Sequence, residues 1–430
     1  MNILVIGAGY VGLTMAVCFS ELGHSVICID KQKNKINTLL KGKLTTFEKN
    51  LDKLLIKNLK SKRLKFDISM KNVANADVVM ISVGTPFDDS LNRYDQNAIY
   101  CVAKNITKFI NKYTIIVIKS TVEVGTCDRV EQIIKEANPK ADFDVVSIPE
   151  FLREGSAVYD FFNPDRIIMG TESQHAKDVI KKLYKPLKKK KFVFTSRCSS
   201  ELIKCASNSF LATKIHFINE MADFCEKVGG NVYDVAHGMG LDKRIGVEFL
   251  KTGPGYGGGC LPKDTKALAS LGKRVGANFN LIEAVICGNE NRIKSFATKT
   301  LSFVENIKNA KIAFLGLAFK SGTDDCRFSP AIDIVLHLIN KGTKVCVYDP
   351  AATKNARSVL KTKVSYAKNE YEAAKDADIM VFATEWKQFR SLDWAKLSKI
   401  VNSKIIFDMR NIVDRQEALK YGFECYKTGC

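Results

Sequence analysis

The fold of this chain is decided by its first residues, Asn2-Ile3-Leu4-Val5-Ile6-Gly7-Ala8-Gly9-Tyr10-Val11-Gly12. The apolar run at residues 2–7 is typical of a buried strand, and the glycines lead into a helical stretch that ends near Leu22. A second apolar strand at residues 25–29 ends in Asp30. This order of strand, G-x-G-x-x-G turn, helix, strand and acid is the dinucleotide-binding fingerprint, which sets a pyrophosphate at the helix N-terminus. We expect Asp30 to hold the adenosine ribose hydroxyls, which favours NAD over NADP.

Further strands of the same sheet are predicted at residues 78–83, 115–119 and 144–148. The residues that follow them are small or polar: Gly84-Thr85-Pro86, Ser120-Thr121, and Pro149-Glu150-Phe151-Leu152-Arg153-Glu154-Gly155-Ser156. Ligands bind beyond the carboxyl ends of parallel strands, so we expect these tips to line the cofactor crevice. Glu150 and Glu154 would share one helical face if their segment were helical.

The last third of the chain repeats this architecture. Strands are predicted at residues 311–315 and 344–348, and residues 376–384 resemble residues 75–83. The turn after the first of these strands, Gly316-Leu317-Ala318-Phe319-Lys320, lacks the glycine pattern, so we do not expect a second NAD site. Lys320 and Arg327 would suit another phosphate-bearing ligand.

Between the two sheets, residues 201–228 are helical in pattern and apolar on nearly every face. Such a helix is buried, either at a domain junction or in a subunit interface. Glu201, Lys204 and Asn208 form a polar stripe on it. Burying a lysine is costly unless it is paired, so Lys204 either pairs with Glu201 or has a function, and we favour function.

Cys260 follows a run of glycines and precedes a predicted helix start, in Gly253-Pro254-Gly255-Tyr256-Gly257-Gly258-Gly259-Cys260-Leu261-Pro262-Lys263-Asp264. Glycines let a ligand approach the main chain and the sulfur closely, and a helix N-terminus with a lysine nearby lowers a thiol pKa. Cys260 is therefore a candidate covalent nucleophile. The alternative is a small buried cysteine beside a turn.

Composition narrows the class of protein. A chain of 430 residues exceeds one hydrophobic core, and no apolar run approaches the roughly 20 residues that span a bilayer, so we expect no membrane partner. The net charge of +20 is spread along the whole length, which favours a lysine-rich solvated surface over a nucleic-acid site. The thirteen cysteines are scattered without a Cys-x-x-Cys pair, and the five histidines are isolated. This indicates a reducing, cytoplasmic location and no metal site.

These motifs resemble the UDP-glucose/GDP-mannose dehydrogenase family, and the resemblance covers essentially the whole chain. Besides the fingerprint and the Cys260 loop it rests on these segments: Gly84-Thr85-Pro86, Lys119-Ser120-Thr121-Val122, 149–154, 163–167, Ala206-Ser207-Asn208, 217–220, 316–320, Thr323-Asp324-Asp325 and Thr384-Glu385-Trp386. The resemblance implies an α/β fold with two Rossmann-like doubly wound domains joined by a long central helix. We expect an NAD-binding domain at 1–196, a central helical dimerisation domain at 197–300 and a UDP-sugar-binding domain at 301–430.

The resemblance also implies a four-electron oxidation of a sugar CH2OH to a carboxylate, with NAD as cofactor and no metal. Its catalytic residues map onto Thr121, Glu150, Lys204, Asn208, Cys260 and Asp264. In this scheme Lys204 and Asn208, with a water held by Thr121 and Asp264, manage the hydroxyl proton and the oxyanion. Cys260 attacks the aldehyde, and Glu150 activates the water that hydrolyses the thioester.

By the same resemblance, the cofactor is expected at Gly7, Gly9, Tyr10, Val11, Gly12, Asp30, Lys35, Thr85, Pro86, Thr121, Glu154, Lys263 and Arg327. The nucleotide sugar is expected at Glu150, Phe151, Leu152, Arg153, Glu154, Lys204, Asn208, Arg244, Phe249, Leu250, Lys251, Thr252, Gly253, Gly257 and Lys320. The central helix would build a homodimer, and Arg244 would reach the partner's substrate.

The chain departs from the family pattern at Leu44-Thr45-Thr46-Phe47-Glu48-Lys49-Asn50-Leu51, a loop expected near the cofactor, and at Glu123, Ile148, Cys205 and Phe328. The motif around Cys260 is nearer the UDP-glucose branch, but UDP-N-acetyl-mannosamine, UDP-N-acetyl-glucosamine and GDP-mannose remain open as substrates. The sequence also leaves open a one-step hydroxyacid dehydrogenase and a non-catalytic NAD-binding protein. The first would not need Cys260, and the second would have no reason to keep six catalytic side chains.

Overall fold

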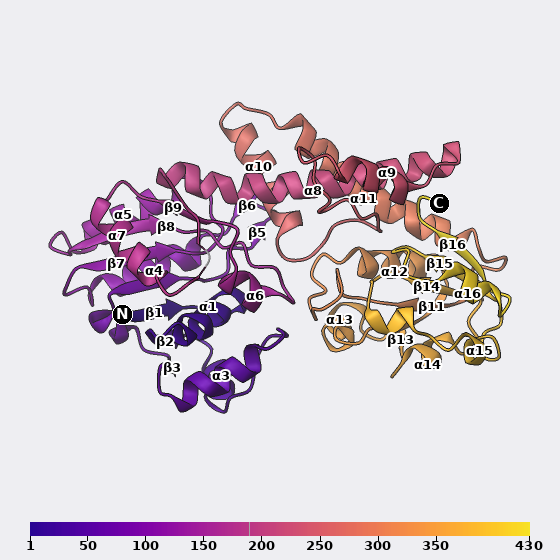
Figure 1. The fold of residues 1–430 in the computed structure, drawn as a ribbon, viewed down its shortest axis with the longest axis horizontal. Helices are drawn as coiled ribbons and strands as arrows, with labels where there is room; N and C mark the ends of the chain where they lie inside the picture. The colour runs from indigo at the N-terminus through magenta and orange to yellow at the C-terminus, as the bar shows by residue number, and fades with distance from the viewer. Residues whose placement is uncertain (189) are drawn as a thin grey trace. The chain divides into compact units, whose positions relative to one another are not determined.

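The computed structural model describes residues 1–188 and 190–430 (Figure 1). The chain divides into two compact units, Met1–Ser207 and Asn208–Cys430. The boundary falls inside helix α8 (Arg197–Val228). The three-domain division expected from the sequence stays a prediction, and each unit is described here by itself.

The first unit is built on an eight-stranded sheet with the order β10-β9-β8-β7-β4-β1-β2-β3 (Figure 1). Its strands are β1 Asn2–Ile6, β2 Ser25–Ile29, β3 Leu64–Asp67, β4 Val78–Ile81, β7 Thr114–Ile118, β8 Phe143–Ser147, β9 Ile167–Gly170 and β10 Phe192–Thr195. The pairings from β3 to β8 are parallel, and β9 is antiparallel to β8. A short hairpin, β5 Phe87–Asp88 and β6 Arg93–Tyr94, extends from the tip of β4.

Helices cover both faces of this sheet because alternate strand residues are apolar on both sides. Val5 packs in a cluster with residues of α1, α2, α3, α6 and α7, whereas its neighbour Leu4 packs in a cluster with η1, α4 and α5. The bounds are α1 Tyr10–Glu21, α2 Lys33–Leu40, α3 Leu51–Lys60, η1 Met70–Asn75, α4 Asn97–Thr107, α5 Thr126–Ala137, α6 Ala157–Phe162 and α7 Gln174–Leu183. Strands buried on both faces are typical of a doubly wound parallel sheet.

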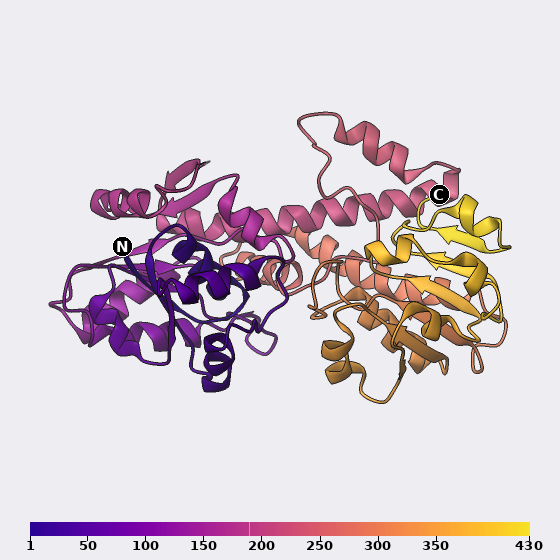
Figure 2. The same ribbon diagram turned by 60° about the horizontal axis from the view of Figure 1, so that its bottom comes forward.

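The second unit contains a six-stranded, fully parallel sheet with the order β13-β12-β11-β14-β15-β16. Its strands, drawn orange to yellow, lie side by side in Figure 2. They are β11 Lys311–Leu315, β12 Lys344–Tyr348, β13 Ser365–Tyr366, β14 Ile379–Phe382, β15 Ile405–Asp408 and β16 Glu424–Lys427.

Helices α11, α12 and α13 pack on one face of this sheet, and α14, η2, α15 and α16 pack on the other. Two more helices, α9 and α10, follow α8 along the chain. The bounds are α9 Val232–Gly240, α10 Leu261–Arg274, α11 Asn280–Leu301, α12 Pro330–Asn340, α13 Thr353–Leu360, α14 Glu370–Ala374, η2 Lys387–Arg390, α15 Trp394–Leu397 and α16 Arg415–Leu419. The predicted fold class, two Rossmann-like units with a long central helix, is confirmed.

Two local features bear on the sequence-based predictions. The central helix begins at Arg197, four residues before the predicted start. The condition under which Glu150 and Glu154 would share a helical face is not met, because residues 149–156 form an irregular segment and turn before α6 begins at Ala157. Within residues 1–188 and 190–430, no helix combines the length and the apolarity needed to cross a membrane.

Candidate active site

The turn between β1 and α1 is held in its shape by glycines. Gly7 has a φ of +102°, and a Cβ on it would lie 2.6 Å from the Ser82 carbonyl oxygen. A Cβ on Gly12 would lie 1.8 Å from the Gly7 oxygen, so a side chain there is incompatible with the turn. Gly9, the N-cap of α1, has no atom within 4 Å of its would-be Cβ. The open space is therefore above Gly9, where the fingerprint expects a pyrophosphate.

Asp30 lies at the end of β2, with its side chain 11% exposed. Its carboxylate accepts hydrogen bonds from the Ala8 and Gln32 backbone N–H groups, each at 2.9 Å, and from Lys35 Nζ at 3.2 Å. Burial acts to raise the pKa of Asp30, but these hydrogen bonds outweigh it and the pKa is lowered. Asp30 is thus an ionised acceptor beside the glycine turn. Its Oδ2 accepts both Ala8 N–H and Lys35 Nζ, whereas Oδ1 accepts the Gln32 N–H and keeps a second lone pair that a ribose hydroxyl could use.

Tyr10 connects the glycine turn to the loop at residues 44–51, where the chain departs from the family pattern. Its hydroxyl bonds to the carboxylate of Glu48, which is 5% exposed, and the pKa of Tyr10 is raised by burial and by Glu48. Glu48 also accepts the backbone N–H groups of Gly155 and Ala157, at 2.8 and 3.0 Å. The atypical loop therefore still joins the fingerprint to the segment that carries Glu150. Val11, the residue after Tyr10, packs against the core on this side of the sheet.

The tips of β4 and β7 meet, as expected for neighbouring parallel strands. Thr85 Oγ1 donates to the Thr121 carbonyl oxygen at 2.6 Å, and Ser120 Oγ donates to the Val83 oxygen at 2.6 Å. Thr85 is buried, whereas Pro86 is exposed beside it. Two predicted site residues from strands distant in sequence, Thr85 and Thr121, are thus directly bonded.

Glu150 follows the end of β8 and is 8% exposed. One carboxylate oxygen accepts the backbone N–H of Leu152, and the other lies 3.7 Å from Lys204 Nζ. Other residues of this segment have different surroundings. Glu154 is half-buried, and the exposed Arg153 pairs with Asp160 at 2.7 Å. The two glutamates of this segment consequently have different surroundings, and it is Glu150 that lies against Lys204.

Lys204 on α8 is 4% exposed. Besides Glu150, its ammonium group has the ring of Phe151, whose centroid is 5.0 Å away. Lys204 thus pairs with a strand-tip carboxylate, and the pairing with Glu201 that the sequence allowed is not the one observed. The function expected of Lys204 therefore has a suitable setting, a buried cation between an anion and an aromatic face.

Glu201 instead caps another helix. It is 2% exposed and accepts the backbone N–H groups of Gly125 and Cys127, at 2.7 and 2.8 Å, at the start of α5. Burial raises the pKa of Glu201, with these hydrogen bonds acting in the opposite direction. Because the loop that carries Thr121 leads into α5, Glu201 fixes the far end of that loop against α8.

In the second unit, Cys260 is exposed and forms the N-cap of α10. Pro262 occupies the first turn of this helix, as the sequence predicted. All thirteen cysteines lie in the described residues, and none is in a disulfide. A thiol at a helix N-terminus faces backbone N–H groups that lack partners within the helix, and these favour its thiolate form.

Asp264 lies one turn into α10 and is completely buried. It accepts Asn208 Nδ2 at 2.5 Å and also pairs with Lys263, while its own N–H donates to the Cys260 carbonyl oxygen at 3.0 Å. Four predicted site residues of this unit are therefore connected: Asn208, Cys260, Lys263 and Asp264. The carboxylate orients the Asn208 amide, which has a second N–H for a ligand.

The glycines before Cys260 also admit close approach by protein groups, a role that the sequence analysis did not identify. A Cβ on Gly257 would lie 2.3 Å from the Phe328 oxygen, and one on Gly259 would lie 2.5 Å from the Arg327 guanidinium. The main chain of the loop thus packs against the loop between β11 and α12. Arg327 itself is held by Asp325 through hydrogen bonds of 2.6 to 3.0 Å.

A scaffold of buried polar side chains holds the Cys260 loop, and sequence reasoning did not identify it as functional. Asn289 bonds both the N–H and the C=O of Tyr256, and Asn219 accepts the N–H of Gly253 at 2.9 Å. Arg292 donates to the Gly253 oxygen at 2.6 Å and pairs with Asp223. Asn219 lies in a family motif, but for Asn289 and Arg292 the only signal was a polar cluster on a helix.

The other residues expected to hold a nucleotide sugar lie in the second unit in several settings. Leu250 and Thr252 are buried and Lys251 is exposed, while Phe249 has a φ of +65°. Lys320 lies 5.6 Å from the ring of Phe319. Arg244 pairs with the nearby Asp242, and its side chain is 89% exposed. The structure thus places Arg244 at the surface of the second unit.

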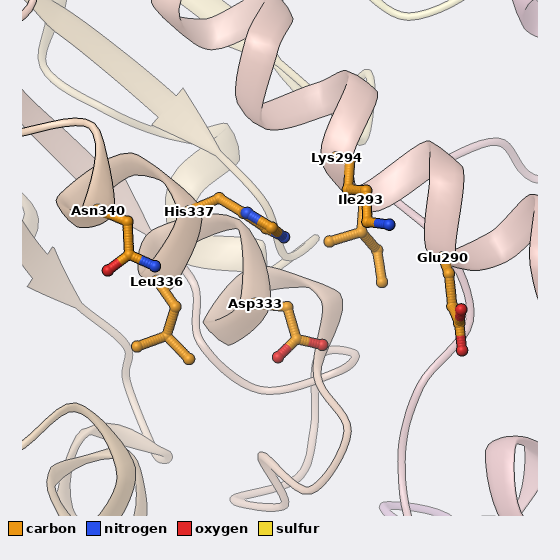
Figure 3. A pocket seen from close by; sticks show the side chains of 7 residues that line it. All are labelled: Glu290, Ile293, Lys294, Asp333, Leu336, His337 and Asn340. Atoms are coloured by element: carbon orange, nitrogen blue, oxygen red, sulfur yellow. The ribbon is translucent and has the colours of Figure 1, made fainter.

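A shallow cavity of about 250 Å³ lies between α11 and α12, and none of its residues was predicted to be functional (Figure 3). It is lined by Glu290, Ile293, Lys294, Asp333, Leu336, His337 and Asn340. Asp333 points into the space between the helices, and burial raises its pKa, while His337 one turn later lowers it. The cavity mixes both signs of charge around two aliphatic side chains, which selects no ligand class.

Comparison with known families matches nearly the whole chain. Residues 1–188 match the NAD binding domain of the UDP-glucose/GDP-mannose dehydrogenase family, residues 198–291 its central domain and residues 313–415 its UDP binding domain. The three matches follow one another in the family's order.

Several known proteins are similar over their full length. The UDP-glucose 6-dehydrogenase of Rhizobium meliloti is 47% identical, covering 100% of this chain and 99% of that protein. The UDP-glucose 6-dehydrogenase YwqF of Bacillus subtilis is 43% identical, covering 100% and 98%. Among solved structures, a UDP-glucose dehydrogenase from Pyrobaculum islandicum superposes with a TM-score of 0.91 at 33% identity, covering 100% and 97%. A UDP-D-ManNAc dehydrogenase from Pyrococcus horikoshii gives 0.88 at 27%, covering 100% and 99%.

Proposed function

Since the chain belongs to the UDP-glucose/GDP-mannose dehydrogenase family, we propose that it oxidises UDP-glucose to UDP-glucuronate with NAD+. The observation that carries the proposal is the full-length similarity to proteins named UDP-glucose 6-dehydrogenase, together with the complete set of six catalytic side chains. Thr121, Glu150 and Lys204 belong to the first unit, and Asn208, Cys260 and Asp264 to the second.

The fingerprint turn fits NAD+. Its open space lies above Gly9, the N-terminus of α1 follows directly, and Asp30 is ionised beside it. Gly7, Gly9 and Gly12 would hold the pyrophosphate and Asp30 the adenosine ribose, with Lys35 ordering Asp30. When bound, NAD+ supplies the hydride acceptor for both oxidations.

In the first oxidation, the residues must remove the hydroxyl proton and stabilise negative charge on the oxygen. Lys204 supplies a buried ammonium group and Asn208 an oriented amide N–H, both suited to an oxyanion. By the family resemblance, Thr121 and Asp264 would serve the removal of the proton through water. The product of this step is the aldehyde.

In the second oxidation, the sulfur of Cys260 forms a bond to the aldehyde carbon and gives a thiohemiacetal, which loses a hydride to become a thioester. Water then bonds to the thioester carbon, the C–S bond breaks and the thiolate of Cys260 leaves. Glu150, buried at the tip of β8, takes the proton of that water. Altogether one CH2OH group, two NAD+ and one water give one carboxylate, two NADH and three protons.

A second substrate class is favoured by one observation. The structure also superposes on a UDP-D-ManNAc dehydrogenase with a TM-score of 0.88. The same side chains would carry the same chemistry on UDP-N-acetyl-mannosamine, and GDP-mannose or UDP-N-acetyl-glucosamine are open for the same reason. Identity supports UDP-glucose, because it is 47% to a UDP-glucose enzyme and 27% to the ManNAc enzyme.

We extend the proposal to a homodimer through α8. Phe210, Phe217 and Phe224 recur every seven residues and are 64%, 44% and 59% exposed in the single chain. Seven residues are nearly two helical turns, so the three rings lie on one face. Exposed apolar stripes of this kind mark protein contacts, and a second copy of α8 is the matching partner. Phe217→Glu should give a monomer in light scattering, and an unchanged dimer would refute this interface.

The exposed Arg244 fits the expectation that it reaches the substrate of the partner subunit. We further propose a cytoplasmic location, because seven of the thirteen cysteines are buried as small apolar side chains and none is in a disulfide.

The decisive experiment counts NADH per sugar consumed, with a panel of nucleotide sugars, for the wild type and Cys260→Ser. We expect two NADH per UDP-glucose in the wild type, and a Ser variant that stalls or traps an adduct. Cys101→Ser, which changes an exposed cysteine on α4, is the matched control and should keep full turnover. One NADH per turnover in the wild type, or undiminished turnover in Cys260→Ser, would refute the mechanism. Binding of NAD+ without turnover of any sugar would favour a regulatory protein.

A further inference from the structure

Lys119 is a buried charged residue to which the proposed mechanism assigns no role. It follows the last residue of β7 directly, is 4% exposed, and its backbone N–H donates to the Ile81 oxygen at 2.9 Å. The next strand in the sheet, β8, leads to Glu150, so the two residues leave neighbouring strands at the same edge. A buried lysine is costly to the fold unless it is paired or used.

The charges that act on Lys119 come from two elements, the Glu150 segment after β8 and Lys204 on α8. Burial lowers the pKa of Lys119 to about 8; the carboxylate of Glu150 acts to raise it and the ammonium of Lys204 lowers it further. Glu150 and Lys204 are themselves 3.7 Å apart, with side chains 9% and 6% exposed. Three buried ionisable side chains therefore form one cluster, with two cations and one carboxylate.

The second sheet shows that the fold does not need a lysine at this place. Strand β15 occupies there the position of β7, since β14 lies beside β11 as β4 lies beside β1. The residue after β15 is Met409, which is completely buried, and its N–H donates to the Phe382 oxygen at 3.0 Å. Met409 thus repeats the backbone setting of Lys119 with an uncharged side chain of similar length.

We propose that Lys119 is a positioning residue for the proposed oxidation: its ammonium group balances the carboxylate of Glu150, so that the charge of Lys204 remains available to the substrate oxyanion. This inference rests on the proposed function. Without Lys119, the charges of Lys204 and Glu150 would cancel each other. With Lys119, the three side chains together carry one net positive charge. Such a charge stabilises a nearby anion more strongly in a buried site than in water.

Lys119 also acts on the hydrolysis of the thioester. The carboxylate of Glu150 accepts the proton of the attacking water, and the ammonium group of Lys119 at the neighbouring strand tip balances its charge. Both consequences are changes in turnover rather than in substrate binding, because the proposal gives Lys119 no contact with the sugar or the cofactor.

The test compares Lys119→Met, which introduces the side chain found at residue 409, with Lys119→Arg, which keeps the charge. With UDP-glucose and NAD+, we expect Lys119→Met to lower kcat about 30-fold while both KM values stay within about 3-fold. Lys119→Arg should recover kcat to within about 3-fold of the wild type. The wild type should lose kcat as pH rises through about 8, the pKa of Lys119, whereas the arginine variant keeps it to higher pH.

The matched control is Lys65→Met, which removes an exposed lysine from β3 and should leave every parameter unchanged. Wild-type kcat in a folded Lys119→Met variant would overturn the inference, as would equal losses in the methionine and arginine variants. A Lys119→Met chain that fails to fold would assign the lysine a structural role and overturn it too. Absence of UDP-glucose turnover in the wild type would refute the proposed function instead, so the two failures are distinguishable.

Discussion

In each of the two sheets, the first strand is followed by the same kind of glycine turn. Gly7 after β1 and Gly316 after β11 have φ values of +102° and +100°. Each donates its N–H across to the strand beside it, Gly7 to Ile29 and Gly316 to Tyr348, both at 2.8 Å. In both turns a Cβ on the glycine would lie within 2.6 Å of the tip of the strand on the other side. The chain thus leaves the two central strands along the same path.

The two sheets differ in the acid that follows the second strand, which is Asp30 in the first sheet and Asp349 in the second. Asp349 is 2% exposed and accepts five hydrogen bonds, from the backbone N–H groups of Leu317, Ala318, Ala351 and Ala352 and from Trp386 Nε1. Asp30 accepts two backbone N–H groups and the flexible Lys35. The carboxylate of Asp349 is therefore committed to its own fold, whereas Asp30 has acceptor capacity for a ligand.

The helix after the turn differs as well. Helix α1 begins at Tyr10, three residues after Gly7, but α12 begins only at Pro330, fourteen residues after Gly316. The inserted loop carries Lys320 and Arg327 and packs against the glycines before Cys260. One Rossmann-like turn thus presents a helix N-terminus, and the other replaces it with a basic loop. The position of the following helix, more than the sheet itself, determines which ligand each unit can hold.

The largest effect is expected from Asp349→Asn, which tests whether this acid is structural. The amide replaces one acceptor oxygen with a donor that faces backbone N–H groups, and each unmatched buried donor costs about 1–3 kcal/mol. We expect a loss of about 4 kcal/mol, seen as a fall of roughly 10 °C in the melting temperature of the second unit.

Asp30→Asn is the counterpart in the first sheet and should behave in the opposite way. Its melting temperature should stay within a few degrees of the wild type, while the KM for NAD+ rises about 10-fold, because the carboxylate proposed to accept the ribose hydroxyls is lost. If both variants lose stability equally, or if Asp349→Asn alone raises the KM for NAD+, the contrast between the two acids is wrong.

A somewhat smaller effect is expected from Lys119→Met on stability, since it gives the first sheet the residue of the second. The folded-state pKa of Lys119, about 8, is lower than its ordinary value of 10.5, so the folded state disfavours the charged form. Below pH 8 the lysine is charged in both states and the full cost, about 3 kcal/mol, is present. As pH rises from 8 to 10.5 the unfolded state binds more protons, and this cost disappears.

Lys119→Met should therefore be more stable than the wild type at pH 7, and the difference should shrink towards zero near pH 10.5. Urea unfolding of both proteins at several pH values measures this difference in stability. The titration of all other lysines is common to both proteins, so it cancels in the difference. A variant that is less stable at pH 7 would show that Lys119 contributes to folding, contrary to the example of Met409.

The sequence predicted those parts of the site that depend on residues close together in the chain. Gly7, Gly9 and Gly12 with Asp30 lie in one strand-turn-helix-strand unit, and Pro262 marked the start of α10 two residues after Cys260. In each case the backbone conformation follows from a few neighbouring residues, so the pattern alone is sufficient.

Contacts between residues that are distant in the sequence could not be predicted from it. Lys204 pairs with Glu150, 54 residues earlier, and Glu201 caps α5, although the helical spacing allowed it to bind the lysine. Asn289 and Arg292 hold a loop more than 30 residues away with side chains that any solvated helix could carry. No periodicity distinguishes such residues, because their partners are set by tertiary packing.

The smallest effect on the folded protein is expected from Gly9→Ala, which tests only the open space proposed to hold the ligand. Gly9→Ala gives the fingerprint turn the residue that the second sheet has at the same place, Ala318. Gly9 has a φ of −75°, which alanine adopts without strain, and nothing lies within 4 Å of the new Cβ. The folded protein should accept the methyl group, with a melting temperature within about 2 °C of the wild type.

Bound NAD+ should not accept it, because the pyrophosphate must approach the backbone of this turn closely. We expect kcat/KM for NAD+ to fall about 100-fold, or about 2.7 kcal/mol, with the KM for the sugar nearly unchanged. Gly238→Ala on α9, where the space is equally open, should change neither parameter. A Gly9→Ala variant with wild-type kcat/KM would mean that the space above Gly9 is not used, and the first turn would then differ from the second in shape alone.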